Sequence, residues 1–290
     1  MIKNLVFKGG GVLGIAYVGA IEALEESNVL STIEKVAGTS AGAITAYLIS
    51  LKYTSAEIKK IVNATDFKSF EDSLNPVRLF TSYGLYKGDK FLSWIKKITT
   101  DKGLKENATF TDLKNAGFLD LHVFATDLNE KQLKRFSFLD TPNTIVVEAV
   151  RASMSIPLLF KAWKFTNSKP DNHIYVDGGM IYNFPMTVFD IDGKDNLNTI
   201  GFFLDNISGD NVINDLDYNH PAKFIGILFE TLMDAQDINV KQDSEEESRT
   251  ITIDDFGISS TNFSISNGDK TKLFNSGKNS AINYLNKLKN

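Results

Sequence analysis

The chain has 290 residues, 42% of them hydrophobic and 23% charged, which suits a globular protein with a sizeable core. It contains no cysteine, which excludes disulfides, thiolate zinc sites and cysteine nucleophiles. The net charge of -5 argues against nucleic-acid binding and gives no overall attraction to anionic membranes. The sequence shows neither the pattern of a secretory signal nor an apolar run long enough to span a membrane. We therefore expect a cytoplasmic protein, or one exported without an N-terminal signal.

The first fifty residues predict alternating strands and helices. Residues 2–7, which end in the apolar residues Leu5-Val6-Phe7, predict a short buried strand, and after Gly14 apolar residues recur at helical spacing up to Leu24. Residues 34–37 predict a second strand, and the uncharged apolar residues 41–51 predict a buried helix. This βαβα order predicts an α/β fold, a three-layer α/β/α sandwich with a mostly parallel central sheet.

The rest of the chain continues in short elements. We expect helices over residues 55–64 (with Ser55 as a candidate cap), 91–98, 144–153, 221–235 and 273–288. We expect strands over residues 121–125, 174–176, 199–204, 250–253 and 262–265. The polar stretch 241–249 is interpreted as a solvated loop or a frayed helix end. No repeat or linker divides the chain, so we expect one domain spanning residues 1–290, with residues 191–290 completing the fold.

Two glycine-framed segments indicate the chemistry. Gly38-Thr39-Ser40-Ala41-Gly42 is a G-x-S-x-G sequence between a predicted strand and a predicted helix, a pattern typical of a nucleophile elbow. The flanking glycines let neighbouring backbone approach the sharp turn that carries the serine. Gly9-Gly10-Gly11-Val12-Leu13-Gly14 follows the first strand and would offer free backbone N–H groups to a developing oxyanion. Ser40 is therefore the candidate nucleophile.

The glycine run has a second interpretation. Gly9, Gly11 and Gly14 also satisfy G-x-G-x-x-G, the dinucleotide-binding fingerprint. That site needs a carboxylate about 20 residues further on, at the end of the second strand. Here the second predicted strand runs into Thr39-Ser40, and Glu34 precedes it. Dinucleotide binding is therefore the less favoured hypothesis.

Ser40 needs a base, and the residues leave two choices open. The chain has three histidines, none within a motif: His122, His173 and His220. A Ser40–Asp177–His220 triad is compatible with chain order. Asp177 ends a predicted strand before Gly178-Gly179, and it would lie on the same carboxyl edge of the parallel sheet as Ser40. Such a carboxylate could accept the serine proton directly, although Asp-Gly is equally typical of a hairpin turn.

These blocks resemble the signature of the patatin-like phospholipases. The resemblance rests on the glycine run at residues 9–14, the G-x-S-x-G at residues 38–42 and Asp177-Gly178-Gly179. Three further segments are similar to the family pattern: Thr126-Asp127-Leu128, Ala152-Ser153 with Pro157, and Asn183 with Pro185. The blocks follow the family's order across residues 5–190.

The resemblance implies a Ser40–Asp177 dyad without histidine. It implies hydrolysis of fatty acyl esters of membrane lipids or lysolipids through an acyl-enzyme, with no metal or other cofactor in the chemical step. The Gly10 and Gly11 N–H groups would form the oxyanion hole, with Gly9 and Ala41 as further candidates. The supporting motif glycines would be Gly14, Gly38, Gly42, Gly178 and Gly179.

Three points stay open within this resemblance. Many members carry Arg or Lys where this chain has Leu13, so a preference for charged head groups does not follow. Residues 67–86 hold many large apolar side chains, and we favour core positions for most of them, with a minority lining an acyl channel or forming a membrane-docking flap. Membrane contact would be peripheral and transient, and an activating protein or ligand is compatible with the sequence.

The alternative class is a catalytically weak lipid-binding or host-interaction protein on the same fold. The intact Ser40, Asp177 and glycine run argue against it, because nothing structural demands a serine on a strained turn.

Overall fold

The chain alternates strands and helices along most of its length. The computed structural model describes residues 1–209, 220–240 and 244–288. The strands are β1 (Asn4–Phe7), β2 (Lys35–Thr39), β3 (Gly84–Tyr86), β4 (Asp120–Asp127), β5 (Gln132–Phe136), β6 (Leu158–Phe160), β7 (Tyr175–Asp177), β8 (Thr199–Asp205) and β9 (Thr250–Asp254). The α-helices are α1 (Ile15–Glu26), α2 (Ala41–Ser50), α3 (Ser55–Ala64), α4 (Arg78–Thr81), α5 (Asp89–Asp101), α6 (Phe110–Asn115), α7 (Val146–Ser153), α8 (Pro221–Val240), α9 (Ser244–Ser248) and α10 (Asn267–Lys287). Short 3-10 helices include η1 (Gly11–Gly14), η3 (Phe67–Phe70), η4 (Gly178–Met180) and η5 (Met186–Phe189).

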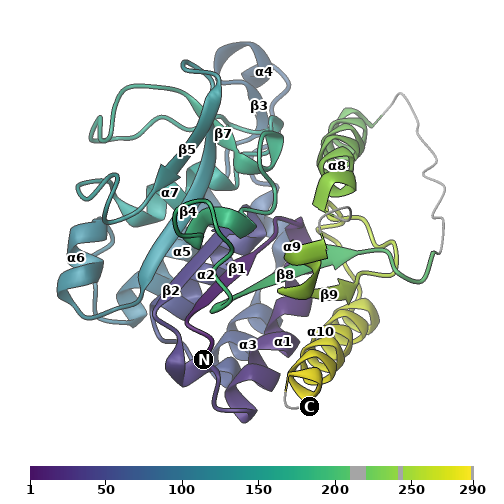
Figure 1. The fold of residues 1–290 in the computed structure, drawn as a ribbon. Coiled ribbons are helices and arrows are strands. Elements are labelled where there is room, and N and C mark those ends of the chain that lie inside the picture. Colours follow the sequence, from purple (N-terminus) through teal and green to yellow (C-terminus); the bar gives the residue numbers. More distant parts are fainter. Residues whose placement is uncertain (210–219, 241–243, 289–290) are drawn as a thin grey trace.

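The central sheet is mixed and mostly parallel, as the sequence predicts. Its strand order is β5-β4-β2-β1-β8-β9, with β7 also paired to β4 (Figure 1). Strands β1, β2, β4, β8 and β9 are parallel to their neighbours within that group. Strands β5 and β7 are antiparallel to β4. A separate parallel pair joins β3 to β6.

Strand β7 does not belong to the parallel set, contrary to the prediction for Asp177. Strand β4 is longer than β2, and its last residues, Ala125–Asp127, pair with β7 beyond the end of β2. Since β5 occupies the other edge of β4 over the same residues, β7 lies on the β2 side, end to end with β2. The antiparallel direction therefore points Asp177 back towards the carboxyl end of β2, where Ser40 begins the next turn.

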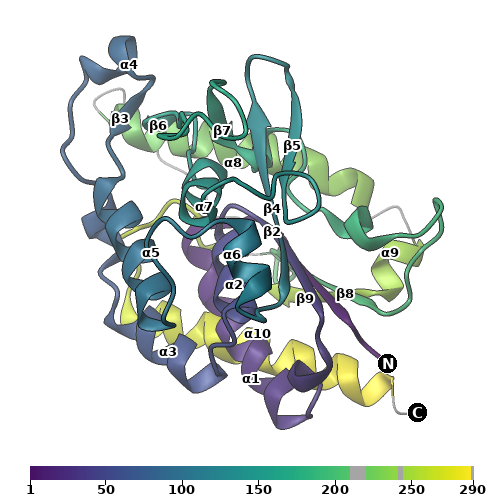
Figure 2. The same ribbon diagram turned by 90° about the vertical axis from the view of Figure 1, so that its left-hand side faces the viewer.

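The two faces of the sheet are covered differently. Along β1, Leu5 and Phe7 belong to the large helical core, while Val6 belongs to a smaller cluster on the opposite face, as the two-residue period of a strand requires. Figure 2 shows α1, α3 and α10 together on one side of the sheet. The segment that includes η5 closes the other face with Phe184, Met186 and Phe189.

The C-terminal part of the chain completes this sheet and its helical layer. Strand β8 pairs with β1 and carries β9 on its outer edge. Helix α10 packs against α1 at glycines: a Cβ added at Gly277 would lie 1.8 Å from the Ala16 carbonyl oxygen. A Cβ added at Gly19 would lie 1.9 Å from the Phe274 carbonyl oxygen. The two helix backbones therefore touch at points where one of the two helices has a glycine.

The structure corrects several local predictions. Residues 262–265 form no strand, because Phe263 and Ile265 are buried as anchors of a loop instead of alternating along a ladder. Ser55 is the first helical residue, and Thr54 is the cap: its Oγ1 accepts the Glu57 N–H at 3.2 Å while the Glu57 carboxylate accepts the Thr54 N–H at 2.8 Å. In the polar stretch 241–249, residues 241–243 lie outside the described residues, and α9 follows them.

None of the helices in the described residues combines the length and apolar character needed to cross a membrane.

Candidate active site

Ser40 lies at the turn between β2 and α2. Its backbone has φ 53° and ψ -123°, a positive φ that residues with a Cβ rarely adopt. Strain of this kind costs about 1–3 kcal/mol and persists only where the surroundings hold it in place. The Ser40 N–H donates to Ser153 Oγ at 2.8 Å, and the whole residue is buried. This is the conformation of a nucleophile elbow.

The glycines around Ser40 mark close contacts between backbones. A Cβ at Gly38 would lie 2.2 Å from the Gly42 carbonyl oxygen, and one at Gly42 would lie 2.3 Å from the Phe7 carbonyl oxygen. A Cβ at Gly9 would lie 3.2 Å from Ser40 Cβ. The glycine run and the serine turn are therefore packed directly against each other.

Asp177 is fully buried at the end of β7. Its Oδ1 accepts the Gly179 N–H at 2.8 Å, and its backbone is held by Ser155 O and Thr126 Oγ1, each at 2.9 Å. Burial raises the pKa of the Asp177 carboxyl to about 7, although the Gly179 N–H and the Ser40 hydroxyl both lower it. At neutral pH such a group is a stronger proton acceptor than a carboxylate in water, while still partly ionised.

The Ser40 hydroxyl and the Asp177 carboxyl lie near each other without a short hydrogen bond. Ser40 Oγ is 3.5 Å from Met154 Sδ, and Asp177 Oδ2 is buried with no hydrogen-bond partner among the described residues. The hydroxyl is still near enough to lower the pKa of Asp177. Hydrogen bonds of this kind are often long in a protein without substrate and shorten when it binds. Asp177 Oδ2 is thus an acceptor available to the Ser40 hydroxyl.

Three backbone donors beside Ser40 have no acceptor among the described residues. In the described part of the chain, nothing accepts a hydrogen bond from the N–H groups of Gly10, Gly11 or Ala41. The Gly9 N–H, by contrast, donates to the Asn183 carbonyl oxygen at 3.0 Å, so this candidate is already engaged. Gly11 has φ 53°, and a Cβ there would lie 2.0 Å from the Ser260 carbonyl oxygen, so only glycine fits.

An apolar cavity of about 60 Å³ adjoins these donors. Gly11, Ala41 and Met154 lie nearest to Ser40, and the walls come from η1, α1, α2, α3, η3, α5 and the loop after β9. The wall residues are Val12, Gly14, Ile15, Val18, Ile21, Ile44, Thr45, Leu48, Ile58, Val62, Phe67, Phe70, Trp94 and Phe263. Of the aromatic stretch 67–86, only its first part therefore reaches this cavity.

The remainder of that stretch divides into buried and exposed parts. Leu85 and Tyr86 are buried in the core. The intervening residues, which include α4, expose Leu74, Val77, Phe80 and Tyr83, with Phe80 87% exposed. Helix α4 projects at the top edge of the molecule in both Figure 1 and Figure 2. The prediction of core positions is thus correct for the two ends of residues 67–86 and wrong for the exposed side chains between them.

The histidines lie elsewhere. His122 is buried in β4, 3.4 Å from Asp120, and His220 is exposed before α8. His173 Nδ1 lies 2.7 Å from Asp127 Oδ2. Within the described residues none of the three forms a hydrogen bond or ion pair with Asp177, whose carboxyl interacts with the Gly179 N–H and the Ser40 hydroxyl.

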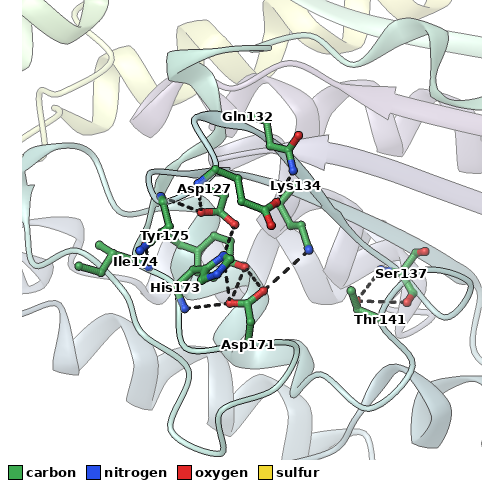
Figure 3. Close-up of polar contacts among 11 residues, drawn as sticks. Asp127, Gln132, Lys134, Ser137, Thr141, Asp171, His173, Ile174 and Tyr175 are labelled. Atoms are coloured by element: carbon green, nitrogen blue, oxygen red, sulfur yellow. Dashed lines mark hydrogen bonds and ion pairs between the residues drawn. The ribbon is translucent and has the colours of Figure 1, made fainter.

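The contact between Asp127 and His173 holds the beginning of β7 against the end of β4. Figure 3 shows His173 and Asp171 turned towards this point, with the Tyr175 hydroxyl donating to Asp171 Oδ2 at 2.8 Å. The Asp127 carboxylate also accepts the Asn129 N–H at 2.9 Å. Ligand atoms of Asp127, Glu130 and His173 lie within 4.8 Å of one another, but these hydrogen bonds already satisfy the buried carboxylate. We interpret these residues as a structural group that holds β7 against β4.

Two contacts of Ser40 were not predicted. Ser153 is part of the family resemblance, but no pattern predicts its contact with Ser40, and no pattern indicates Met154. Both reach Ser40 from the end of α7, so the contact depends on tertiary packing and leaves no local signal. Glu34, considered for nucleotide binding, is exposed and paired with Lys3 at 2.5 Å.

A buried serine on a strained strand-to-helix turn, set in a mostly parallel α/β sheet, is typical of hydrolases with a nucleophile elbow. The family model described as patatin-like phospholipase matches residues 5–190, and the chain belongs to that family. Family membership indicates a lipid hydrolase, the function that the sequence analysis favours over dinucleotide binding.

Relatives and solved structures agree with this assignment. The chain is 32% identical to YqhO of Bacillus subtilis over 94% of both proteins. It is 34% identical to R571 of Acanthamoeba polyphaga mimivirus and 27% identical to the probable lipid hydrolase 463L of Invertebrate iridescent virus 6. These matches cover 66% and 64% of the chain, but only 62% of each viral protein. The fold is similar to that of VipD from Legionella pneumophila, with a TM-score of 0.66 and 19% identity over 99% of this chain and 67% of VipD.

Proposed function

We propose that the chain hydrolyses fatty acyl esters of membrane lipids or lysolipids through a Ser40–Asp177 dyad. Asp177 accepts the Ser40 proton as Oγ attacks the ester carbonyl, and the N–H groups of Gly10, Gly11 and Ala41 stabilise the oxyanion. Collapse of this intermediate expels the alcohol, which takes the proton from Asp177, and leaves an acyl-serine. Asp177 then deprotonates water, which attacks the acyl carbon and releases the fatty acid with Ser40 restored.

The observation that carries this proposal is the environment of Asp177. A fully buried carboxyl with its pKa raised to about 7 sits next to a serine on a strained turn, with no histidine in contact among the described residues. Burial of this kind costs stability, and groups with such raised pKa values concentrate at catalytic sites. The free donors beside Ser40 supply the other requirement of acyl transfer.

The apolar surroundings support a lipid substrate. The cavity beside Gly11 and Ala41 is walled by aliphatic and aromatic side chains and would receive the first part of an acyl chain. The exposed side chains of Leu74, Val77 and Phe80 would contact the membrane surface transiently. We infer that the acyl chain enters from a membrane on that side.

Labelling with a fluorescent fluorophosphonate tests the proposal. The wild type is expected to be labelled, and Ser40→Ala is expected to lose the label. Ser50→Ala is the matched control, because Ser50 is buried at the other end of α2 and donates only to the Tyr47 carbonyl oxygen. Label retained by Ser40→Ala would contradict the role of Ser40 as nucleophile, and folded wild type that is unlabelled even with liposomes would instead favour the alternative of a lipid-binding protein on this fold.

A further inference from the structure

Helix α8 contacts two loops of the site through one side chain, that of Gln236. The Gln236 Nε2 amide donates to the Gly179 carbonyl oxygen at 2.6 Å, and Gln236 Oε1 accepts the Asn183 N–H at 3.0 Å. Because a backbone carbonyl only accepts and a backbone N–H only donates, these two contacts fix the orientation of the side-chain amide. The family match ends at residue 190, so this contact comes from a part of the chain to which the family pattern gives no role.

The first contact holds the loop that carries the proposed base. The Gly179 N–H donates to Asp177 Oδ1 at 2.8 Å, so the carbonyl and the N–H of one residue link Gln236 to Asp177. Met233, about one helical turn before Gln236, packs on the same loop: a Cβ added at Gly179 would lie 3.2 Å from Met233 Sδ. Helix α8 therefore both packs on Gly179 and bonds to it.

The second contact reaches the glycine run. The Asn183 carbonyl oxygen accepts the Gly9 N–H at 3.0 Å, so the N–H and the carbonyl of Asn183 link Gln236 to Gly9. Gly9 lies against the nucleophile, since a Cβ added there would lie 3.2 Å from Ser40 Cβ. One side chain of α8 thus connects the loop of Asp177 with the loop of the proposed oxyanion donors.

Helix α8 is itself anchored to the glycine run on both sides of this connection. Asp237 lies 2.5 Å from Lys8 Nζ, and Lys8 directly precedes the run. Glu230 Oε1 accepts the Ser260 hydroxyl at 2.8 Å, and the Ser260 carbonyl oxygen accepts the Val12 N–H at 2.9 Å. These contacts hold the helix in register with the site, so the Gln236 side chain has a fixed place from which to act.

The loop that Gln236 holds also sets the strength of the proposed base. Burial raises the pKa of the Asp177 carboxyl to about 7, while the Gly179 N–H and then the Ser40 hydroxyl lower it. Of these two donors the Gly179 N–H has the larger effect. If Gly179 lost its alignment, the ionised carboxyl would lose this donor and the pKa of Asp177 would rise further.

The charged groups on the elements around Asp177 are engaged elsewhere. On β4, the Asp127 carboxylate is paired with His173. On α8, the Asp237 carboxylate is paired with Lys8. No charged side chain of the described residues shifts the pKa of Asp177, so a change in that pKa would report on the Gly179 N–H and the Ser40 hydroxyl.

We propose that Gln236 is a positioning residue for the hydrolysis, which holds Gly179 against Asp177 and Asn183 against the glycine run. The inference rests on the proposed function, because Gln236 acts only through the proposed base and the loop of oxyanion donors. Gln236 is not among the residues that line the apolar cavity, so it acts without touching the acyl chain. Its loss is expected to change the activation of Ser40 and not the binding of substrate.

The test measures the second-order rate constant of fluorophosphonate labelling between pH 5 and 9. Gln236→Met keeps the length of the side chain and removes its amide. The midpoint of its pH profile is expected to rise by about one unit, the shift that loss of a hydrogen bond to a charged group produces. At pH 6, where the rate follows the ionised fraction of the base, labelling should fall about tenfold. Thr231→Ala is the control on the same helix and should keep the wild-type profile, because Thr231 Oγ1 donates to the Ile227 carbonyl oxygen within α8.

Gln236→Glu tests the same connection with a side chain of equal size. Its ionised carboxylate still accepts the Asn183 N–H but cannot donate to the Gly179 carbonyl oxygen. Its negative charge also disfavours ionisation of Asp177. The midpoint should therefore rise at least as far as in Gln236→Met, and this variant decides by the same criterion if Gln236→Met does not fold.

Three outcomes would overturn the inference. A rate that falls equally at every pH, with an unchanged midpoint, would mean that Gln236 only supports the fold. A wild-type profile in both variants would mean that Gln236 does not position the base. If the wild type is not labelled at any pH, the proposed function fails, and carbon NMR of protein labelled at the aspartate carboxyls then measures the Asp177 pKa directly, with Asp177→Asn to assign the signal. Equal Asp177 pKa values in wild type and Gln236→Met would reject the positioning role.

Discussion

In the proposed mechanism the chemistry depends on one buried carboxyl, Asp177, and the folded protein holds this group at a cost in stability. A carboxyl with a pKa of about 4 in the unfolded chain and about 7 in the folded protein destabilises the folded state whenever it is ionised. The unfolded chain loses this proton at a lower pH, so the cost grows as the pH rises from about 4 to 7 and is then constant. Asp177 is therefore expected to be retained for function and not for stability.

Asp177→Asn should accordingly stabilise the protein. Above pH 7 the gain in unfolding free energy is expected to reach up to about 4 kcal/mol, and it should shrink towards zero as the pH falls to about 4. Urea unfolding of both proteins at pH 5, 6, 7 and 8 measures it. A stability difference that does not change with pH would show that the Asp177 pKa is not raised.

The same pKa predicts the pH dependence of the reaction. Because the proposed base acts in its ionised form, kcat/KM on a soluble ester should rise about tenfold per pH unit below the pKa and level off above about 7. The rise of kcat/KM with pH is measured between pH 5 and 9. Asp177→Asn should reduce turnover to background. If His220→Ala instead reduces turnover by several orders of magnitude, the Ser40–Asp177–His220 triad replaces the dyad, whereas full activity of Asp177→Asn would contradict both.

At the scale of elements, the sequence predicts the structure correctly where the pattern is local. The βαβα start, the G-x-S-x-G turn and the glycine run are each set by residues within one segment. The direction of β7 was missed because three residues carry no periodicity and their pairing depends on the overhang of β4. The engagement of the Gly9 N–H was missed because its acceptor, the Asn183 carbonyl, lies far along the chain.

The segment around α4 carries exposed apolar side chains whose expected role is membrane contact. Phe80→Ser should lower hydrolysis of vesicle lipids by about tenfold, since burying one Phe side chain is worth about 1.5–3 kcal/mol. Hydrolysis of a soluble short-chain ester should stay at the wild-type rate. Leu197→Ser is the control, because Leu197 is 80% exposed in the loop before β8. Equal losses in the two variants, or none on vesicles, would argue against contact through α4.

At the scale of the whole molecule, the family match ends at residue 190, but elements beyond that residue pack against those that carry the site. Strand β8 covers the edge of β1, the strand that leads into the glycine run. Helix α10 covers α1, the helix that follows this run. We infer that residues 191–290 belong to the same folding unit as the site, and that unfolding either part would disorder the oxyanion donors.

Two glycines within α10 test this coupling. Gly277→Ala would force a methyl group to within 1.8 Å of the Ala16 carbonyl oxygen, where two backbones leave no room to yield, and should destabilise by about 2 kcal/mol or more. Gly268→Ala places the same methyl in open space, with its nearest neighbour, Ser266 Oγ, at 3.6 Å, and should stabilise by up to about 1 kcal/mol through helix propensity. Thermal unfolding, followed both by circular dichroism and by fluorophosphonate labelling, should give one transition. Its midpoint temperature should fall in Gly277→Ala and should not fall in Gly268→Ala. In a single cooperative unit, loss of α10 from α1 would also disturb the glycine run that precedes α1. Two separate transitions, with labelling unaffected by Gly277→Ala, would therefore mean that the C-terminal part unfolds independently.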